Sequence, residues 1–323
     1  MNRPKLTMAF SIYDRHVPFF DGTVEVKDVD LVVLAVGEAN VLRDGGNRHH
    51  RMLLDQEFDA CEVSLSSYIM AKSQGLPIVA IPVFPRRLFS QSQIWVHSES
   101  TIHAPRDLIG RRVGVISFQT TLSVQMKGDF QLEYEVPWRQ IDWYVAAEEP
   151  IQFAPPAGVN ISQIPGNKKM AQLLEEREID AWVTPRPPMA TNSSAAKIRR
   201  LFTDPREEER RYFGKHGYFP AMHVMALKED SVRKYPWIPV ALMEAFKKAH
   251  EICRSYYADP NWTTLAWTRH LFEEQELLGR DLWPVGLADN RNNLDAFVGY
   301  MLEQGLLNEA PPLKELFIDG DGA

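Results

Sequence analysis

Short apolar runs separated by polar turns recur along the whole chain, and most of them are strand length. Residues 5–12 alternate between polar and apolar side chains, and residues 30–36 contain a continuous apolar run at 31–36, which are the two patterns expected of strands. Further strands are predicted at 59–63, 78–83, 92–97, 111–116, 141–145, 159–164, 180–184 and 221–227. Helical patterns separate many of these strands, so the chain is predicted to be an α/β protein.

Several of the predicted helices begin after polar capping residues or end before a glycine. The sequence predicts helices at 66–74, 122–130 and 168–178, the second half of 41–56, and a helical C-terminal third at 231–257, 262–278 and 290–304. The charged run 206–211 is typical of a solvated helix face. The C-terminal helices could bury their apolar faces against the rest of the chain or against a second copy, so a homo-oligomer is left open.

Residues 57–89 gather hydrogen-bond donors at the ends of two predicted strands. Ser64, Ser66 and Ser67 stand at the start of the helix 66–74, and Arg86 and Arg87 follow the strand 78–83. Helix N-termini, hydroxyl groups and guanidinium groups all favour anions. We therefore expect this region to form one wall of a carboxylate site.

Length and composition restrict the class of protein. A chain of 323 residues is expected to form two lobes, and a repeat of the strand, polar cap, helix pattern at 117–121 predicts that the second lobe has its own ligand-facing edge. The net charge of −7 argues against a nucleic-acid partner. The apolar runs are shorter than the roughly 20 residues of a membrane span, and no export signal is recognised, which predicts a cytoplasmic protein. Cys61 and Cys253 are expected to be reduced, buried thiols.

Six sequence blocks in order resemble the 4,5-dihydroxyphthalate decarboxylases, from about Leu6 to Leu316. The blocks are Tyr13-Asp14-Arg15, E-F-D-x-x-E-x-S-L-S-S-Y (57–68), A-I-P-V-F-P-x-R (80–87), D-L-I-G-R-R-V-G-V (107–115), F-P-x-M-H-V (219–224) and W-P-x-G (283–286). The resemblance implies a fold similar to the type II periplasmic binding proteins, with mixed sheets flanked by helices and a cleft between two lobes. Lobe one would comprise 1–97 and 216–323, and lobe two would comprise 98–215.

The same resemblance implies an enzyme that converts 4,5-dihydroxyphthalate to 3,4-dihydroxybenzoate and CO2, without a cofactor, in the breakdown of phthalate-like compounds. Three places depart from the family pattern: Phe118-Gln119-Thr120-Thr121, where Tyr-Gln-Met-Thr is common, Gln91-Ser92, where His-Ser is common, and an unusual Gly-Gly-Asn insertion around Asn47. These departures keep open a relative that acts on a different ring. A non-catalytic solute-binding protein for a small aromatic or amino-acid-like acid is the alternative function.

Candidate substrate-binding residues were chosen by their chemistry and by their position at predicted strand or helix ends. A guanidinium binds a carboxylate through paired donors, and Arg15, Arg87 and Arg186 each follow a predicted strand. Surface exposure is the alternative for each of these arginines. Hydroxyl or amide donors would come from Ser64, Ser66, Ser67, Gln119 and Thr120, with helix capping as the alternative for the serines. Tyr13, Phe89, Phe219 and Trp283 could flank an aromatic ring, or pack in the core.

Candidate catalytic residues follow from the need to protonate a ring carbon. His223 is the first candidate for proton donor, because histidine changes charge near neutral pH and this one lies at a predicted crossing strand. A hydrogen-bonded core histidine is the alternative. Asp14 and His16 could orient or deprotonate a ring hydroxyl, or Asp14 could cap a turn.

Other site chemistries find little support in the sequence. His49 and His50 are adjacent, so they would point in different directions on a helix, and no third ligand stands at a usual spacing; we expect no metal site. The chain also lacks a Ser-His-Asp order, a Gly-rich phosphate loop and a Cys/His cluster at usable spacings. Hydrolase, kinase and zinc-enzyme functions are therefore disfavoured.

Overall fold

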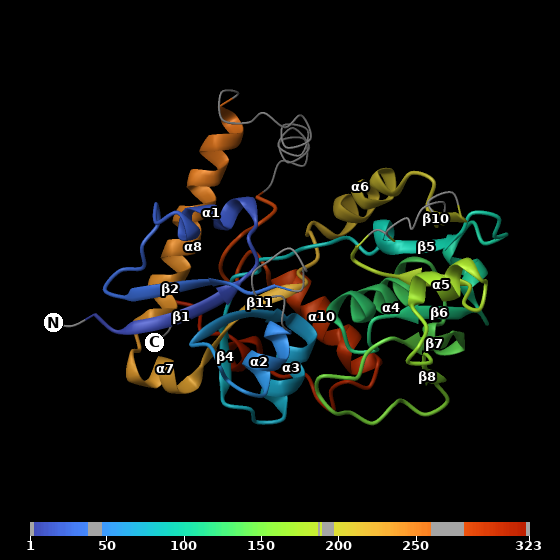
Figure 1. The fold of residues 1–323 in the computed structure, drawn as a ribbon, viewed down its shortest axis with the longest axis horizontal. Helices are drawn as coiled ribbons and strands as arrows, with labels where there is room; N and C mark the ends of the chain where they lie inside the picture. Colours follow the sequence, from blue (N-terminus) through green and yellow to red (C-terminus); the bar gives the residue numbers. More distant parts are fainter. Residues whose placement is uncertain (1–2, 38–46, 187, 189–196, 260–280, 321–323) are drawn as a thin grey trace. The chain divides into compact units, whose positions relative to one another are not determined.

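Two compact units make up the protein, and each has its own sheet with helices around it (Figure 1). The computed structural model describes residues 3–37, 47–186, 188, 197–259 and 281–320. Unit 1 consists of Met1–Arg86, His223–Arg291 and Pro311–Ala323, and unit 2 consists of Arg87–Met222 and Asn292–Ala310. The predicted α/β class with two mixed sheets is confirmed.

The sheet of unit 1 has five strands in the order β2-β1-β3-β11-β4. The strands are β1 (Lys5–Phe10), β2 (Asp30–Ala35), β3 (Ala60–Ser64), β4 (Ile78–Ile81) and β11 (His223–Lys228). β1 is parallel to both β2 and β3, whereas β11 runs antiparallel between β3 and β4. The first residue of β11, His223, is therefore paired with Ser64, the last residue of β3. The antiparallel strand brings its amino end to the edge where the parallel strands end.

Helices cover this sheet and bury its apolar positions. They are η1 (Asp14–His16), α1 (Val17–Phe20), α2 (Arg48–Leu53), α3 (Leu65–Ser73), α7 (Glu229–Lys234), α8 (Ile238–Ala258) and α11 (Leu313–Leu316). Met8 and Phe10 of β1 form one hydrophobic cluster with Leu242 and Phe246 of α8. Burial of such side chains stabilises the unit by roughly 1.5–3 kcal/mol each. The cluster holds the C-terminal end of β1 in place, and it therefore also positions the polar segment that follows Phe10.

One prediction for the helices of unit 1 was wrong. Residues 231–257 were expected to form one helix, but α7 ends at Lys234 and α8 begins at Ile238. Pro236 lies in the interruption, and proline cannot donate the backbone hydrogen bond that a continuous helix would need. The helix predicted at 262–278 lies outside the described residues.

The sheet of unit 2 has six strands in the order β10-β5-β9-β6-β7-β8. They are β5 (Ile94–His97), β6 (Arg112–Val115), β7 (Asp142–Val145), β8 (Ile161–Gln163), β9 (Ala181–Val183) and β10 (Ile198–Arg200). β6 to β9 are mutually parallel where they pair, and β5 is antiparallel to β9 and β10. β10 was not predicted from the sequence. Its short segment gains strand geometry only by pairing with β5.

The helices of unit 2 include the predicted charged surface helix. They are η2 (Gln91–Gln93), η3 (Pro105–Leu108), α4 (Thr121–Glu133), η4 (Trp138–Gln140), α5 (Met170–Glu175), α6 (Pro205–His216) and α10 (Arg291–Glu303), whose first residue is counted with unit 1. The unit bounds differ from the lobes expected from the sequence, which placed 87–97, 216–222 and 292–310 in lobe one. β5 belongs to unit 2 because it pairs with β9 and β10.

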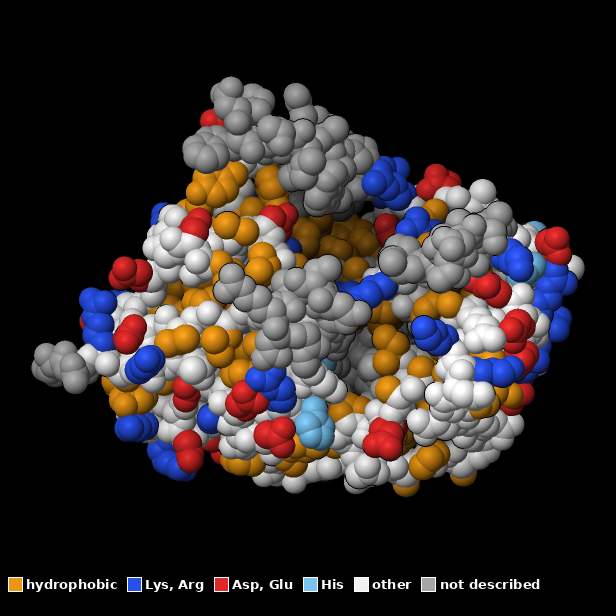
Figure 2. Space-filling view, viewed as in Figure 1, with side chains coloured by type: hydrophobic (Ala, Val, Ile, Leu, Met, Phe, Trp, Pro, Cys, Tyr) orange, Lys and Arg blue, Asp and Glu red, His pale blue; other side chains and the backbone are white. Residues whose placement is uncertain are grey.

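The described surface has mixed charge. On the face shown in Figure 2, Lys and Arg side chains are interspersed with Asp and Glu side chains over each unit. None of the helices in the described part of the chain is long and apolar enough to cross a membrane.

Candidate active site in unit 1

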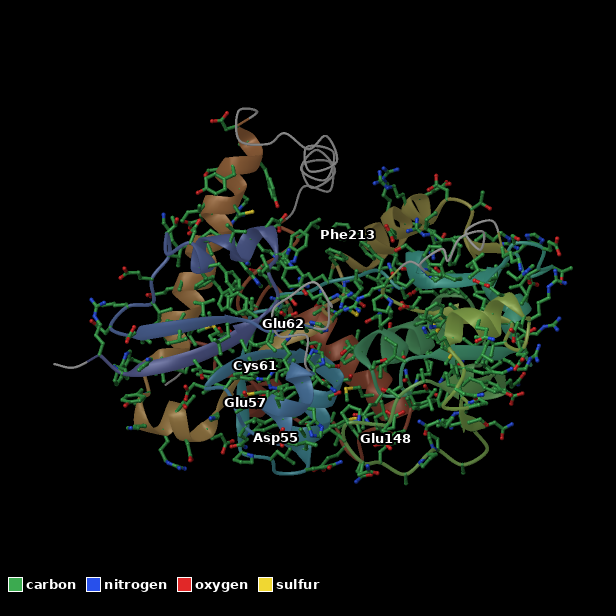
Figure 3. All side chains as sticks on the ribbon, in the orientation of Figure 1. Asp55, Glu57, Cys61, Glu62, Glu148 and Phe213 are labelled. Carbon is green, nitrogen blue, oxygen red and sulfur yellow. The ribbon has the colours of Figure 1, made fainter. Side chains whose placement is uncertain are left out.

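A buried carboxylate, Glu62, forms the centre of a polar cluster at the strand ends of unit 1. Glu62 lies on β3, in the interior of the sheet (Figure 3), and its side chain is fully buried. Its Oε2 accepts a hydrogen bond from the backbone N–H of Ser11 at 2.9 Å. Three side chains approach the other oxygen, Oε1, and two of them can carry positive charge.

Arg48 provides the permanent counter-charge for Glu62. It is the first residue of α2, and its side chain is 2% exposed. Its Nη2 lies 2.9 Å from Glu62 Oε1, while its Nε and Nη1 donate to the carbonyls of Glu62 and Val36. Burial alone would raise the pKa of Glu62, but Arg48 and the hydrogen bonds from His223 and Ser11 hold that pKa well below its ordinary value. Glu62 is therefore a carboxylate at neutral pH.

His223 is held by Glu62 through one ring nitrogen. Its Nδ1 lies 2.5 Å from Glu62 Oε1, and its side chain is 10% exposed. Burial lowers the pKa of His223, although its bond to Glu62 opposes that shift. The neutral ring donates from Nδ1 to the carboxylate, which leaves Nε2 as the nitrogen that can exchange a proton with a ligand.

A second imidazole lies beside His223. The rings of His49 and His223 meet edge to face, with centroids 5.0 Å apart. Burial, the charge that His223 carries when protonated, and the charge of Arg48 hold the pKa of His49 well below its ordinary value. Both rings are therefore neutral in the protein at pH 7.

Tyr13 and Arg15 join this cluster from the segment that follows β1. The Tyr13 hydroxyl donates to Glu62 Oε1 at 3.0 Å, and burial together with Glu62 raises the pKa of Tyr13 to about 12. The guanidinium of Arg15 lies 4.5 Å from the centroids of both Tyr13 and Trp283, and it donates to the Pro85 carbonyl. Tyr13 and Trp283 thus flank the protein's own guanidinium, whereas the sequence suggested that they flank a substrate ring.

His16 and Asp14 make local contacts near this cluster. His16 is fully buried, its Nδ1 lies 3.1 Å from the Ser11 carbonyl, and its ring packs against Phe10, Tyr13 and Phe246. Burial holds the pKa of His16 well below its ordinary value. Asp14 accepts from the backbone N–H of Arg15 at 2.8 Å, as a turn-capping aspartate does. These are the contacts of a core histidine and a turn cap.

The serines of the 57–68 block lie at the beginning of α3, beside His223. Ser64 is the N-cap residue, and its hydroxyl is 3.2 Å from that of Ser66. The Ser67 hydroxyl is buried and has no hydrogen-bond partner among the described residues. The first N–H groups of a helix lack partners within the helix, so this end of α3 offers donors to an anion.

Arg87, Phe89 and Phe219 lie together in unit 2. Arg87 is 4% exposed, and its Nη1 donates to the Phe219 carbonyl at 2.6 Å. The rings of Phe89 and Phe219 stack on each other with centroids 4.5 Å apart. These three residues therefore support one another within unit 2.

The remaining candidates, Gln119, Thr120 and Arg186, also belong to unit 2. The buried amide of Gln119 exchanges hydrogen bonds with the backbone of Ile151, at 2.5 and 3.2 Å. Thr120 is the N-cap residue of α4, and its hydroxyl is 2.7 Å from that of Ser123. Arg186 is exposed. The predicted meeting of these residues with Arg15 and His223 around one ligand stays a prediction.

Sequence reasoning missed two residues of the cluster, Glu62 and Arg48. Glu62 stands within the quoted 57–68 block, and a glutamate in the middle of an apolar strand is a signal, because a buried carboxylate requires a partner. Arg48 had no comparable signal, since only the packing of α2 brings it to Glu62. Its neighbours His49 and His50 were considered only as metal ligands, and the sequence argued against that role.

The structure also shows the surroundings of the possible metal ligands and of the two cysteines. Within the described ranges, no three His, Cys, Asp or Glu side chains are grouped so that they could hold a metal ion. Cys61 and Cys253 are both buried free thiols, as predicted.

Solved structures resemble this chain in fold. The sulphonate-binding protein SsuA of Escherichia coli matches with a TM-score of 0.57 at 14% identity, covering 97% of each chain. SsuA of Xanthomonas axonopodis pv. citri, bound to MOPS, matches with a TM-score of 0.57 at 12% identity, covering 98% of this chain and 99% of that one. The desulfurization enzyme DSZB matches with a TM-score of 0.52 at 14% identity, covering 98% and 97%. The predicted periplasmic-binding-protein fold is confirmed.

Sequence relatives identify the family more closely. No protein-family model matches the chain. The 4,5-dihydroxyphthalate decarboxylase of Pseudomonas putida is 29% identical over 212 residues, which cover 64% of this chain and 80% of the relative. The 4,5-dihydroxyphthalate decarboxylase of Comamonas testosteroni is 30% identical over 329 residues, which cover 98% of this chain and 97% of the relative. As its sequence blocks predicted, this chain belongs to the 4,5-dihydroxyphthalate decarboxylase family.

Proposed function

We propose that this protein is a decarboxylase of a hydroxylated aromatic dicarboxylate, with 4,5-dihydroxyphthalate as substrate and 3,4-dihydroxybenzoate and CO2 as products. One observation of the structure carries the proposal: His223, at the beginning of β11, is hydrogen-bonded through Nδ1 to the buried, ionised Glu62. A histidine held in this way can present Nε2 to a ligand in a fixed orientation. Family membership supplies the reaction class.

The chemistry requires one proton at a ring carbon. A hydroxyl group para to the carboxylate donates electron density into the ring, and the carbon that bears the carboxylate takes a proton from Nε2 of protonated His223. The bond from that carbon to the carboxylate then breaks, CO2 leaves, and the electron pair of the broken bond restores the aromatic ring. His223 regains its proton from solvent, so each turnover consumes one proton.

Glu62 and Arg48 are positioning residues for this step. Glu62 holds the His223 ring through Nδ1 and stabilises the imidazolium form, while Arg48 keeps Glu62 ionised. Burial disfavours the charged ring in the absence of ligand. A bound dianion adds negative charge beside the ring and would raise the pKa of His223, so substrate binding itself would prepare the acid.

The first step in binding would use donors beside His223. The start of α3 offers backbone N–H groups, and the buried Ser67 hydroxyl has no partner in the described part of the chain. A substrate carboxylate could accept hydrogen bonds from these N–H groups and from the Ser67 hydroxyl. These donors lie next to His223 because Ser64 and His223 are paired across the sheet.

The test is direct measurement of turnover. Purified protein is incubated with 4,5-dihydroxyphthalate while CO2 and 3,4-dihydroxybenzoate are followed. We expect His223→Gln to lower kcat by about 10²- to 10⁴-fold, the usual contribution of a positioned general acid. His250→Gln serves as the control, because His250 is a buried histidine of the same unit on α8.

Two results would contradict the proposal. Tight binding of the compound without CO2 release would instead support the solute-binding alternative. Equal activity in wild type and His223→Gln would remove His223 from the proton transfer.

A further inference from the structure

Arg86 lies beside the candidate active site and is the last residue of the first segment of unit 1. It follows β4, and its backbone carbonyl accepts a hydrogen bond from the backbone N–H of His223 at 3.3 Å. The preceding residue, Pro85, accepts a hydrogen bond from the guanidinium of Arg15. Arg86 is half-buried. Hydrogen bonds therefore connect the main chain at 85–86 to Arg15, in the segment after β1, and to His223, the first residue of β11.

The positive charge of Arg86 lies within electrostatic range of the candidate active site, as its backbone bond to His223 requires. Its positive charge lowers the pKa of three ring groups of the cluster, Tyr13, His49 and His223. Coulomb interactions weaken with distance, so a guanidinium that acts on all three groups lies near each of them. Arg87, the next residue, instead donates to the Phe219 carbonyl in unit 2.

The described carboxylates do not balance all the positive charges of the cluster. Arg48 pairs with Glu62 at 2.9 Å, and Arg15 pairs with Asp14 at 3.4 Å. No carboxylate of the described residues lies within ion-pair distance of Arg86. The two imidazoles and the Tyr13 hydroxyl are neutral at pH 7 because of their shifted pKa values. Among the described residues of the cluster, Arg86 is therefore the guanidinium without an ion pair, and its charge is available to a ligand.

We propose that Arg86 binds a carboxylate of the substrate and makes the site selective for aromatic dicarboxylates over monocarboxylates. This inference deepens the proposed function and uses the same site. A guanidinium is suited to the task because it offers two parallel N–H donors to one carboxylate. Half-burial reduces the screening of that interaction by solvent.

Of the two carboxylates, Arg86 holds the one that the product retains. The departing carboxylate loses its negative charge as CO2 forms, so a strong ion pair with it would stabilise the substrate more than the transition state. An ion pair with the retained carboxylate is kept throughout the reaction and costs no rate. This assignment predicts that Arg86 contributes to KM more than to kcat.

Binding of an unreactive dicarboxylate tests the inference. Phthalate carries both carboxylates but no hydroxyl group, and benzoate carries one carboxylate, so calorimetric Kd values for the two compounds measure the selectivity without turnover. We expect Arg86→Gln to weaken phthalate binding about 100-fold, because the variant loses a partly buried, charge-assisted contact with one carboxylate. The Kd of benzoate should change less than about threefold. The Kd of phthalate for Arg86→Lys should lie between the values for wild type and Arg86→Gln, because lysine keeps the charge but lacks the paired donors.

The controls separate this inference from the proposed function. Arg233→Gln removes one positive charge from the exposed helix α7 of the same unit, where Arg233 pairs with Asp230, and should leave both Kd values unchanged. Unchanged phthalate binding in Arg86→Gln would overturn the inference, as would equal losses for phthalate and benzoate. If Arg86→Gln fails to fold, the same comparison is made with Arg86→Lys. Absence of CO2 release in the wild type would contradict only the proposed function.

Discussion

Two fully buried carboxylates, Glu62 of unit 1 and Asp129 of unit 2, have opposite protonation chemistry. Asp129, on α4, accepts hydrogen bonds only from neutral groups among the described residues: the Ser90 hydroxyl at 2.6 Å, the Gln125 amide at 2.9 Å and the Tyr212 hydroxyl at 3.1 Å. Burial raises the pKa of Asp129 to about 7. The pKa of Glu62 is shifted the other way, well below its ordinary value.

The charge of the partners, rather than burial, decides the difference. Arg48 gives Glu62 a full positive charge at 2.9 Å, and this attraction together with its hydrogen bonds outweighs the cost of burial. Asp129 has hydrogen bonds but no cation within the described residues, so burial outweighs them. Because Arg48 keeps Glu62 ionised, the charge of Glu62 stays constant near neutral pH while it holds His223. The charge of Asp129, in contrast, changes near neutral pH.

The largest expected effect is on stability, from replacing each carboxylate with its amide. Glu62→Gln leaves the charge of Arg48 buried without compensation, and we expect the free energy of unfolding to fall by about 3–5 kcal/mol. Asp129→Asn should cost no more than about 2 kcal/mol, because its partners are neutral. Urea unfolding of the two variants measures both values. Equal losses would show that the charge of Arg48 does not distinguish the two sites.

The pH dependence of stability should differ in sign between the two carboxylates. The pKa of Asp129 is raised from 3.8 to about 7 on folding, so its contribution is fully present below pH about 4 and is lost as pH rises to about 7. The slope approaches about 1.4 kcal/mol per pH unit and should vanish in Asp129→Asn. The pKa of Glu62 is depressed, so its contribution is present above its ordinary pKa of 4.5 and is lost as pH falls below it. Urea unfolding at several pH values checks both trends, and an unchanged slope in Asp129→Asn would contradict the first.

The smallest effect is expected at the edge of the Glu62 cluster. Tyr13→Phe removes one hydrogen bond to Glu62 but keeps the ring beside the Arg15 guanidinium. We expect a loss of about 1 kcal/mol in unfolding free energy, the usual net value of one hydrogen bond. Thermal or urea unfolding is sufficient to measure it. A loss as large as that of Glu62→Gln would mean that Tyr13, and not Arg48, controls the ionisation of Glu62.

Much of the fold could be predicted because strands and helices leave local patterns. The apolar run 78–83 corresponds to β4, and the serine cap with its following helix corresponds to α3. β10 could not be predicted, because Ile198–Arg200 has strand geometry only through its pairing with β5. The break in the helix predicted at 231–257 does have a local signal, because Pro236 cannot continue a helix.

The candidate site could be predicted in part. His223, Tyr13 and Arg15 were selected from the sequence, and the structure joins Tyr13 and His223 through Glu62. Arg86 and Arg87 follow the same strand, and Arg87 rather than Arg86 was selected from the sequence as a carboxylate-binding residue. The structure separates them into different units, with Arg86 beside His223 and Arg87 against Phe219.

By itself, the sequence determined the α/β class, the family and the kind of chemistry, because periodicity, capping residues and ordered sequence blocks are properties of neighbouring positions. Only the tertiary structure decided that Glu62 is ionised, that His223 has one committed ring nitrogen, and that Arg86 rather than Arg87 lies beside His223. The reason is physical: protonation state and ion pairing depend on distance and burial. Both arise when residues far apart in the chain, such as Arg48 and His223, are packed around the same carboxylate.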